Sequence, residues 1–334
     1  MSQQVGTGKY ERLLARCQGL EPVPTAVAHP CEASALSGAV EAAHRGLIKP
    51  LLVGPAARIR EIAASEGIDL GDLEIVDVPH SNASAAKAVG LIKEGRAEIL
   101  MKGSLHTDEL MSAIVSREGG LRTARRISHV FVMDVPSYPK LLLITDAAVN
   151  IAPTLEEKAD IVQNAIDLAH SLGIDQPKVA ILSALETVTA RIPSTIEAAA
   201  LCKMADRHQI TGGILDGPLA FDNAISLESA KVKHIDSPVA GDADILLVPD
   251  MEAGNMLAKE LSYLSGAEAA GIVLGAQVPI MLTSRADSPH ARLASCAIAM
   301  LYGRSALESS ISCSAARQSS SSLPAPGARH NERK

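Results

Sequence analysis

Residues 278–301 read VPIMLTSRADSPHARLASCAIAML, and this stretch decides the fold class. An apolar strand is expected to run into residues 283–287, after which Ser288 and Pro289 have the residue types of a helix N-cap and a first helical position. The helix that follows has small and apolar residues at helical spacing on one face. These buried positions are Leu293, Ala297 and Met300. A strand that leads directly into a helix is typical of a parallel sheet covered by helices.

The same order of elements recurs along the rest of the chain. Apolar runs predict strands at 51–53, 74–78, 98–101, 130–133, 141–145, 178–182, 213–215, 244–248, 271–274 and 280–283. Amphipathic stretches lie between them, and capping boxes of Thr154 with Glu157 and of Ser194 with Glu197 predict two helix starts. This alternation predicts an α/β fold with mostly parallel sheets.

Composition excludes several classes of partner. The 334 residues predict two domains or one large unit, and 47% hydrophobic residues are enough for a sizeable core. Aromatic residues make up only 2% of the chain, which disfavours a protein that stacks single-stranded nucleic acid. A net charge of -7 opposes binding to a phosphate backbone. We therefore expect no nucleic-acid partner.

The chain also lacks the sequence signs of a membrane or secreted protein. Residues 1–12 are polar, and no run of about 18 apolar residues occurs, so we expect a cytoplasmic protein without a membrane segment. Five cysteines without a Cys-x-x-Cys pair fit neither a disulfide framework nor a zinc ribbon. From Ser305 the composition shifts to Ser, Ala, Pro and Arg, which predicts a disordered tail over 305–334.

Ser284 and Arg285 are the first candidates for chemistry. They are expected between the carboxyl end of a parallel strand and a helix N-terminus, where open α/β sheets bind anions. The Arg285 guanidinium adds a planar fork of donors that suits phosphate. Alternatively, Arg285 pairs with Asp287 and Ser284 caps a turn. The local pattern fits both interpretations equally.

A second candidate is LMKGSLHTDEL at 100–110, which also follows a strand and opens a helix. Lys102 supplies a cation and Gly103 could expose backbone donors to an anion, although the segment is not a Walker A loop. A lone histidine such as His106 is more often a satisfied polar residue at a helix start. Nearby arginines form either a solvated face or a contact for a nucleotide phosphate. They are Arg122, Arg125 and Arg126.

Two further turns combine small residues with polar ones, as is typical where a ligand approaches the backbone closely. The first is ITDAAVN at 144–150, with Asp146 and Asn150, and the second is LDGPLAFDNAIS at 215–226, with Asp222 and Asn223. Helix capping would explain each of these residues individually.

Taken together, the segments resemble a known family. The resemblance is carried by SPVAGDADILLVPDMEAGN at 237–255, LDGPLAFDNA at 215–224, ITDAAVN at 144–150 and LTSRADS at 282–288, and it spans roughly residues 38–302. The chain is similar to the phosphate acetyltransferase and butyryltransferase family. These phosphotransacylases interconvert acyl phosphate plus coenzyme A with acyl-CoA plus phosphate.

The resemblance implies two doubly wound α/β domains of the isocitrate-dehydrogenase-like type, with the active cleft between them. The first domain would comprise residues 1–145 plus 276–304, and the second residues 146–275. Coenzyme A is then a co-substrate, and no metal and no tightly bound cofactor is expected. The expected partners are acyl-CoA, CoA, inorganic phosphate, acyl phosphate and a second copy of the chain in a homodimer.

The resemblance also implies roles for individual residues. Arg285 would clamp the transferred phosphate and Ser284 would bond the reacting group. The aspartate that acetyltransferases carry seven residues after this serine is replaced by Ala291, so Asp287 and His290 become the candidates that activate the thiol. We count Asp287 as catalytic because SRADS resembles the butyryltransferase branch. The expected substrate-binding residues are Lys102, Gly103, Thr107, Asp146, Asn150, Asp222, Asn223 and Asn255.

Two alternatives remain open from the sequence. A metal-dependent NAD dehydrogenase of similar fold would need a metal cluster, for which Asp242, Asp244 and Asp250 are close in sequence. A module that binds acyl-CoA without catalysis would fit the missing aspartate at Ala291, but it would not explain an intact Ser284 with Arg285. The preference for acetyl or butyryl groups also stays open, since one methylene changes binding by only about 1–3 kcal/mol.

Overall fold

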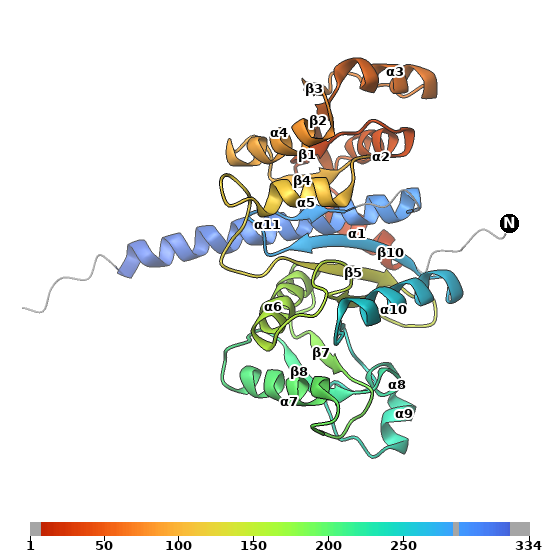
Figure 1. Cartoon of the computed structure of the whole chain (residues 1–334), viewed down its shortest axis with the longest axis vertical. Helices are drawn as coiled ribbons and strands as arrows, with labels where there is room; N and C mark the ends of the chain where they lie inside the picture. Colours follow the sequence, from red (N-terminus) through yellow and green to blue (C-terminus); the bar gives the residue numbers. More distant parts are fainter. Residues whose placement is uncertain (1–7, 283–286, 321–334) are drawn as a thin grey trace, which may run out of the picture.

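The computed structural model describes residues 8–282 and 287–320, and the strands within these ranges form one eleven-stranded sheet (Figure 1). The strands are β1 (Val23–Ala28), β2 (Ile48–Gly54), β3 (Glu74–Asp77), β4 (Ile99–Lys102), β5 (Ser128–Asp134), β6 (Leu142–Thr145), β7 (Lys178–Leu182), β8 (Ile214–Leu219), β9 (Ile245–Leu247), β10 (Glu268–Leu274) and β11 (Ile280–Met281). Their order across the sheet is β3-β2-β1-β4-β11-β10-β5-β6-β9-β7-β8.

Helices cover both faces of this sheet. They are α1 (Lys9–Cys17), α2 (Ala33–His44), α3 (Ala56–Glu66), α4 (Ser81–Lys93), α5 (Thr107–Val115), α6 (Leu155–Ser171), α7 (Pro193–Asp206), α8 (Phe221–Ile225), α9 (Leu227–Val232), α10 (Met251–Leu264) and α11 (Pro289–Ser320). The expected α/β class with a mostly parallel sheet is therefore confirmed.

The centre of the sheet is antiparallel. Strand β5 pairs antiparallel with both β6 and β10, and β10 also pairs antiparallel with β11. Residues 135–141 are too few to carry a crossover, so β5 and β6 must form a hairpin. The remaining pairings are parallel.

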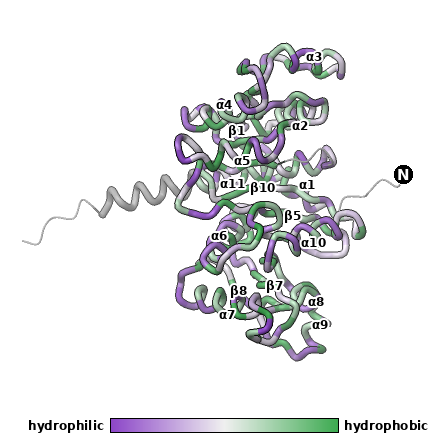
Figure 2. Tube along the Cα trace, viewed as in Figure 1, coloured by the Kyte–Doolittle hydropathy of each residue, from purple (hydrophilic) through white to green (hydrophobic). Residues whose placement is uncertain are grey.

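The buried core differs between the two faces of the sheet. On one face a continuous cluster runs from α2 and α3 through α11 to α6 and α7, and it includes Val130 and Val132 of β5. On the opposite face one cluster lies under α4 and α5, and a separate one lies under α8 to α10. Figure 2 shows the apolar strands inside and polar segments along the outer loops. The hydrophobic core thus divides in two on one face, close to β5 and β10.

Local signals predicted several element starts correctly and one incorrectly. Thr154 and Glu157 form the expected capping box, with N···O distances of 3.0 and 3.3 Å. The predicted capping box of Ser194 with Glu197 was wrong. Helix α7 begins one residue earlier, at Pro193, and proline is favoured at the first helical position. The Ser194 hydroxyl instead lies 2.8 Å from the Ser183 hydroxyl. Strand β1 was not predicted at all.

Helix α11 extends into the segment where a disordered tail is expected, and the tail stays a prediction. The helix continues to Ser320, well beyond Ser305, where the tail was predicted to begin. Loss of an apolar period removes the sign of packing but not the helix propensity of Ala, Leu, Glu and Arg, which occupy positions 306–308 and 315–317. Residues 321–334 lie outside the described part of the chain.

One sheet runs through both expected domains. The chain was expected to pass from the first domain to the second near Asp146, directly after β6, and to return near Ala276, shortly after β10. Both strands neighbour β5, so the two crossings lie close together in the sheet. The division into domains stays a prediction. Within the described ranges, no helix has the length and apolar character needed to cross a membrane.

Candidate active site

A cavity of about 490 Å³ lies where the core divides. Lys102 at the end of β4 and Leu282 just after β11 contribute to it, because parallel strands end at the same edge of a sheet. The antiparallel strands β5 and β10 supply the floor. The lining residues are Lys102, Leu105, His106, Thr107, His129, Phe131, Ala148, Ala269, Gly271, Leu282 and Asp287.

The predicted residues Lys102, Thr107 and Asp287 come together in this cavity. Ser284 and Arg285 lie outside the described residues. Leu282 and Asp287, which flank that pair in the sequence, both line the cavity.

A second cavity of about 380 Å³ shares Phe131, Ala269 and Asp287 with the first. Asn255 of α10 lines it, and its side-chain amide donates to the Ala147 carbonyl oxygen at 3.2 Å. Ala291 lines it as well. The predicted Asn255 therefore lies next to the site of Lys102 and Asp287.

Gly103 does not provide the free backbone donor that the sequence suggested. Its N–H donates to the Ala28 carbonyl oxygen at 2.8 Å, which continues the pairing of β4 with β1. A Cβ at this position would lie 2.4 Å from the Ala28 oxygen and 2.5 Å from the His29 oxygen. Gly103 is required by close backbone packing beside Lys102.

Asp146 and Asn150 hold the loop after β6 in place. The buried Asp146 carboxylate accepts the N–H groups of Ala148, Val149 and Asn150 at 2.9–3.1 Å. The Asn150 amide also donates to that carboxylate at 2.5 Å and to the Ile127 carbonyl at 2.9 Å. Ala148 of this loop lines the first cavity. Asp146 and Asn150 therefore shape the cavity wall through hydrogen bonds within the protein.

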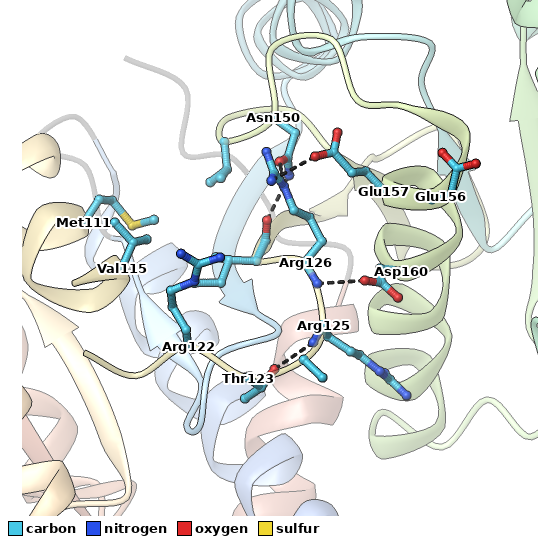
Figure 3. A pocket seen from close by; sticks show the side chains of 13 residues that line it. Met111, Val115, Arg122, Thr123, Arg125, Arg126, Asn150, Glu156, Glu157 and Asp160 are labelled. Carbon is cyan, nitrogen blue, oxygen red and sulfur yellow. Dashed lines mark hydrogen bonds and ion pairs between the residues drawn. The ribbon is translucent and has the colours of Figure 1, made fainter. Parts of the chain in front are cut away.

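The arginine cluster lines a third cavity, of about 460 Å³, on the other side of this loop. Figure 3 shows Arg126 directed at Asn150 and Glu157, with N···O distances of 2.6 and 2.8 Å. Arg125 pairs with Asp167 at 2.5 Å. Within residues 8–282 and 287–320, the exposed Arg122 side chain makes no hydrogen bond or ion pair. Two of the three arginines are thus engaged in surface ion pairs, and Arg122 is the one left for an anion.

Asp222 and Asn223 are not brought to these cavities. The Asp222 carboxylate lies 3.5 Å from the Lys233 ammonium, and the Asn223 amide donates to Glu186. Lys233 also pairs with Glu186 at 2.7 Å, which lowers the pKa of Glu186 through this hydrogen bond. The two predicted residues belong to a separate polar cluster at the end of β8.

The three aspartates of the dehydrogenase alternative have other partners. Asp242 and Asp244 pair with Lys140 at 2.7–2.8 Å, and Asp242 also pairs with Lys178 at 2.6 Å. Asp250 caps α10 through the Ala253 N–H at 2.8 Å. Their arrangement serves ion pairing and helix capping.

The two candidates for the thiol base are placed differently. His290 Nδ1 lies 2.6 Å from Glu268 and its Nε2 lies 3.4 Å from Glu11, and the residue lines neither of the two adjoining cavities. Asp287 lines both of them. Ser288 caps the helix that follows, because its hydroxyl accepts the Ala291 N–H at 3.0 Å, as predicted. The geometry favours Asp287 over His290.

The sequence analysis missed His129, which lies on β5 and lines the cavity. Its side chain is buried, and its Nδ1 has no hydrogen-bond partner among the described residues. Burial lowers the pKa of His129 to about 4, and the nearby Asp146 carboxylate opposes this shift. A histidine within the apolar run SHVFVM indicates ordinary core packing, so no local pattern marks this position as part of a site.

Comparison with known proteins identifies the family of the chain. Residues 80–300 match the family model described as "phosphate acetyl/butaryl transferase". The chain is 67% identical over 294 residues to a phosphate acetyltransferase of Rhizobium meliloti, covering 88% of this chain and 93% of that protein. It is 40% identical over 292 residues to a phosphate butyryltransferase of Clostridium acetobutylicum, covering 87% of this chain and 97% of the relative.

A solved structure is similar along most of its length. The branched-chain phosphotransacylase of Enterococcus faecalis V583 superposes with a TM-score of 0.73 at 32% sequence identity, covering 84% of this chain and 99% of that one. Family model, relatives and fold agree with one another. The chain therefore belongs to the phosphate acetyl/butyryl transferase family and is an acyltransferase.

Proposed function

We propose that the cavity of Lys102 and Asp287 is the active site in which this acyltransferase interconverts acetyl-CoA plus phosphate with acetyl phosphate plus CoA. The observation that carries the proposal is that Leu282 and Asp287, which flank Ser284 and Arg285, line one cavity with Lys102. The division of the core at the same place supports an active cleft between the two expected domains.

Phosphate is the substrate group that needs cations. Lys102 and Arg285 would hold its charge, and the N-terminus of α11 adds a favourable dipole. Ser284 would donate to the reacting group. In the direction of acetyl phosphate synthesis, a phosphate oxygen attacks the thioester carbonyl, and the thiolate of CoA leaves when the C–S bond breaks.

Asp287 is our candidate for the group that exchanges a proton with the CoA thiol. A thiol with a pKa near 8.5 needs a base to attack as thiolate. Positions 287 and 291 both line the second cavity, so a carboxylate at either place would reach the same space. Asp287→Asn should lower kcat about a hundredfold or more, and adding Ala291→Asp to this variant should restore part of the loss.

Acetyl is the favoured acyl group because the 67% identical relative is an acetyltransferase, whereas the butyryltransferase shares 40%. We also propose a homodimer. Exposed apolar residues on α10 provide a surface for it, with Met256 64%, Tyr263 78% and Leu264 82% accessible. Equilibrium sedimentation of the protein and of a Tyr263→Lys/Leu264→Lys variant tests this surface.

The direct test of function is phosphate-dependent release of free thiol from acetyl-CoA or butyryl-CoA, followed with a thiol reagent. The proposal expects faster release from acetyl-CoA. Arg285→Ala should reduce the rate about tenfold to a hundredfold, since charge-assisted contacts contribute about 1.5–3 kcal/mol. Absence of release from both thioesters at micromolar enzyme would refute catalysis and favour a module that only binds acyl-CoA.

A further inference from the structure

His129 is a buried histidine in the cavity wall whose ring has no hydrogen bond within the described chain. It is 2% exposed, and Nδ1 is enclosed without a partner. A buried polar side chain usually has a partner, because an unpaired donor or acceptor loses its hydrogen bonds to water on burial without replacing them. Because His129 lines a cavity, a bound substrate can supply the hydrogen-bond partner that the described chain does not.

The ring is fixed in one orientation by its neighbours. His129 and Phe131 lie on the same face of β5, and their rings meet edge to face with centroids 4.3 Å apart. Opposite them, Gly271 of β10 leaves room for the imidazole, because a Cβ there would lie 2.9 Å from Nε2. His129 and Gly271 both line the cavity, Nε2 is the ring nitrogen directed at Gly271, and only Nδ1 is enclosed without a partner, so the geometry points to Nε2 as the nitrogen at the cavity wall.

The imidazole is neutral at this place. Burial disfavours the imidazolium and holds the pKa of His129 at about 4, although Asp146 acts in the opposite direction. A neutral ring carries one N–H, and a hydrogen on the enclosed Nδ1 would be a buried donor without an acceptor. The tautomer with the hydrogen on Nε2 places the donor where a substrate can accept it.

From this geometry we infer that His129 is a catalytic residue, which donates its Nε2–H to the acyl carbonyl oxygen and stabilises the oxyanion of the tetrahedral intermediate. The inference rests on the proposed function. As the phosphate oxygen bonds to the carbonyl carbon, the C=O electron pair moves to the oxygen, and it returns when the C–S bond breaks. The Nε2 proton stays on His129 throughout.

A neutral donor suits this oxygen better than it suits phosphate. The carbonyl oxygen is uncharged in the bound substrate and gains charge only in the transition state, so a preorganised donor there acts on the rate. Phosphate is charged from the start and is better matched by Lys102 and Arg285. A base for the thiol would have to accept a proton, which burial opposes at His129.

The test compares His129→Leu with His129→Gln in the assay of phosphate-dependent thiol release. Leucine fills the space without a donor, whereas the glutamine amide can place an N–H near the position of Nε2. We expect kcat to fall about 100- to 1000-fold in His129→Leu, as for loss of one oxyanion donor, with the KM for phosphate unchanged. His129→Gln should recover at least tenfold of that loss. Gly271→Ala, whose Cβ would displace Nε2, should also lower kcat.

Controls separate the possible failures. The same two substitutions at His44, an exposed residue of α2, should leave kcat within twofold of the unmodified enzyme. An inactive unmodified enzyme would refute the proposed function itself. With an active enzyme, a kcat within threefold in both His129→Leu and Gly271→Ala would refute the inference. A raised KM for phosphate at unchanged kcat would also refute it, because this result would indicate that His129 binds phosphate. Loss of the acid limb of the pH–kcat/KM profile in His129→Gln would refute it too, because this result would indicate base catalysis.

Discussion

Gly103→Ala should destabilise the protein although it adds a single methyl group. The new Cβ would lie 2.4 Å from the Ala28 oxygen and 2.5 Å from the His29 oxygen, both of which are backbone atoms. Real Cβ atoms do not approach so closely, so the chain after β4 must move away from the end of β1. That movement would also displace Lys102, which lies next to Gly103 in the sequence.

The hydrogen bonds at this junction set the magnitude. Gly103 N–H donates to Ala28 at 2.8 Å, and both the N–H and the hydroxyl of Ser104 donate to the His29 oxygen, at 2.9 and 2.8 Å. Each such bond contributes about 1 kcal/mol, so separating the two segments should lower the free energy of unfolding by about 2–4 kcal/mol. Catalytic activity should fall as well, because Lys102 moves.

Urea denaturation measures this change as a lower midpoint at an unchanged m-value. The matched control is Gly90→Ala in the middle of α4, where the new Cβ would meet only the end of the Glu94 side chain at 3.9 Å. Alanine should stabilise that helix by about 0.5–1 kcal/mol, so the same substitution should have opposite signs at the two glycines. A Gly103→Ala protein as stable as the unmodified one would refute the steric argument.

Three further predictions concern ionisable residues. Lys9→Met should lower the free energy of unfolding by about 3–5 kcal/mol, because the buried Asp134 carboxylate would lose the Lys9 ammonium that lies 2.8 Å away. Lys9→Met/Asp134→Leu should recover much of this loss in urea melts. The pKa of His129 is about 4 in the folded protein and 6.5 in the unfolded chain, so the unfolded chain binds more protons between these pH values. The free energy of unfolding should therefore fall by about 3 kcal/mol from pH 6.5 to 4. His129→Leu should flatten this part of the curve of unfolding free energy against pH. Arg122→Gln should weaken CoA binding about fivefold at low salt and by less at 0.5 M, measured calorimetrically, if the third cavity accepts a CoA phosphate.

Cap chemistry and strand periodicity were sufficient for the parts of the fold that depend on neighbours in sequence. Ser288 caps α11 as expected because the bond to Ala291 is local, and the apolar runs match strands for the same reason. The antiparallel placement of β5 depends on the short connection to β6 and on its pairing with the distant β10. Strand β1 carries Pro24 at its second position, which makes an apolar run look unlike a strand.

The site was predictable to the same extent. Lys102 was expected to bind an anion because of its place after a strand, and Asp287 was assigned to the site through the family resemblance. They line one cavity because β4 and β11 are direct neighbours in the sheet. Asp222 follows β8, the last strand at the far edge of the sheet, so the same polar pattern leads to a different place. Which strand ends meet depends on strand order, and strand order is not a local property of the sequence.

His129 shows why the sequence left one part of the site unassigned. Along β5, residues 130 and 132 pack into the continuous core, whereas 129 and 131 face the side where the core divides. Period-2 alternation distinguishes these two faces, but both are covered by other parts of the chain and both therefore carry apolar residues. One face becomes a cavity wall because the small Gly271, the β10 partner of Phe131, lies against the His129 ring, and because β11 ends nearby. Both come from segments about 140–150 residues away in the sequence. The long-range pairing of β5 with β10 thus turns a face of the core into the wall of a cavity. A neutral, buried histidine is the kind of group that such a wall can present to a carbonyl.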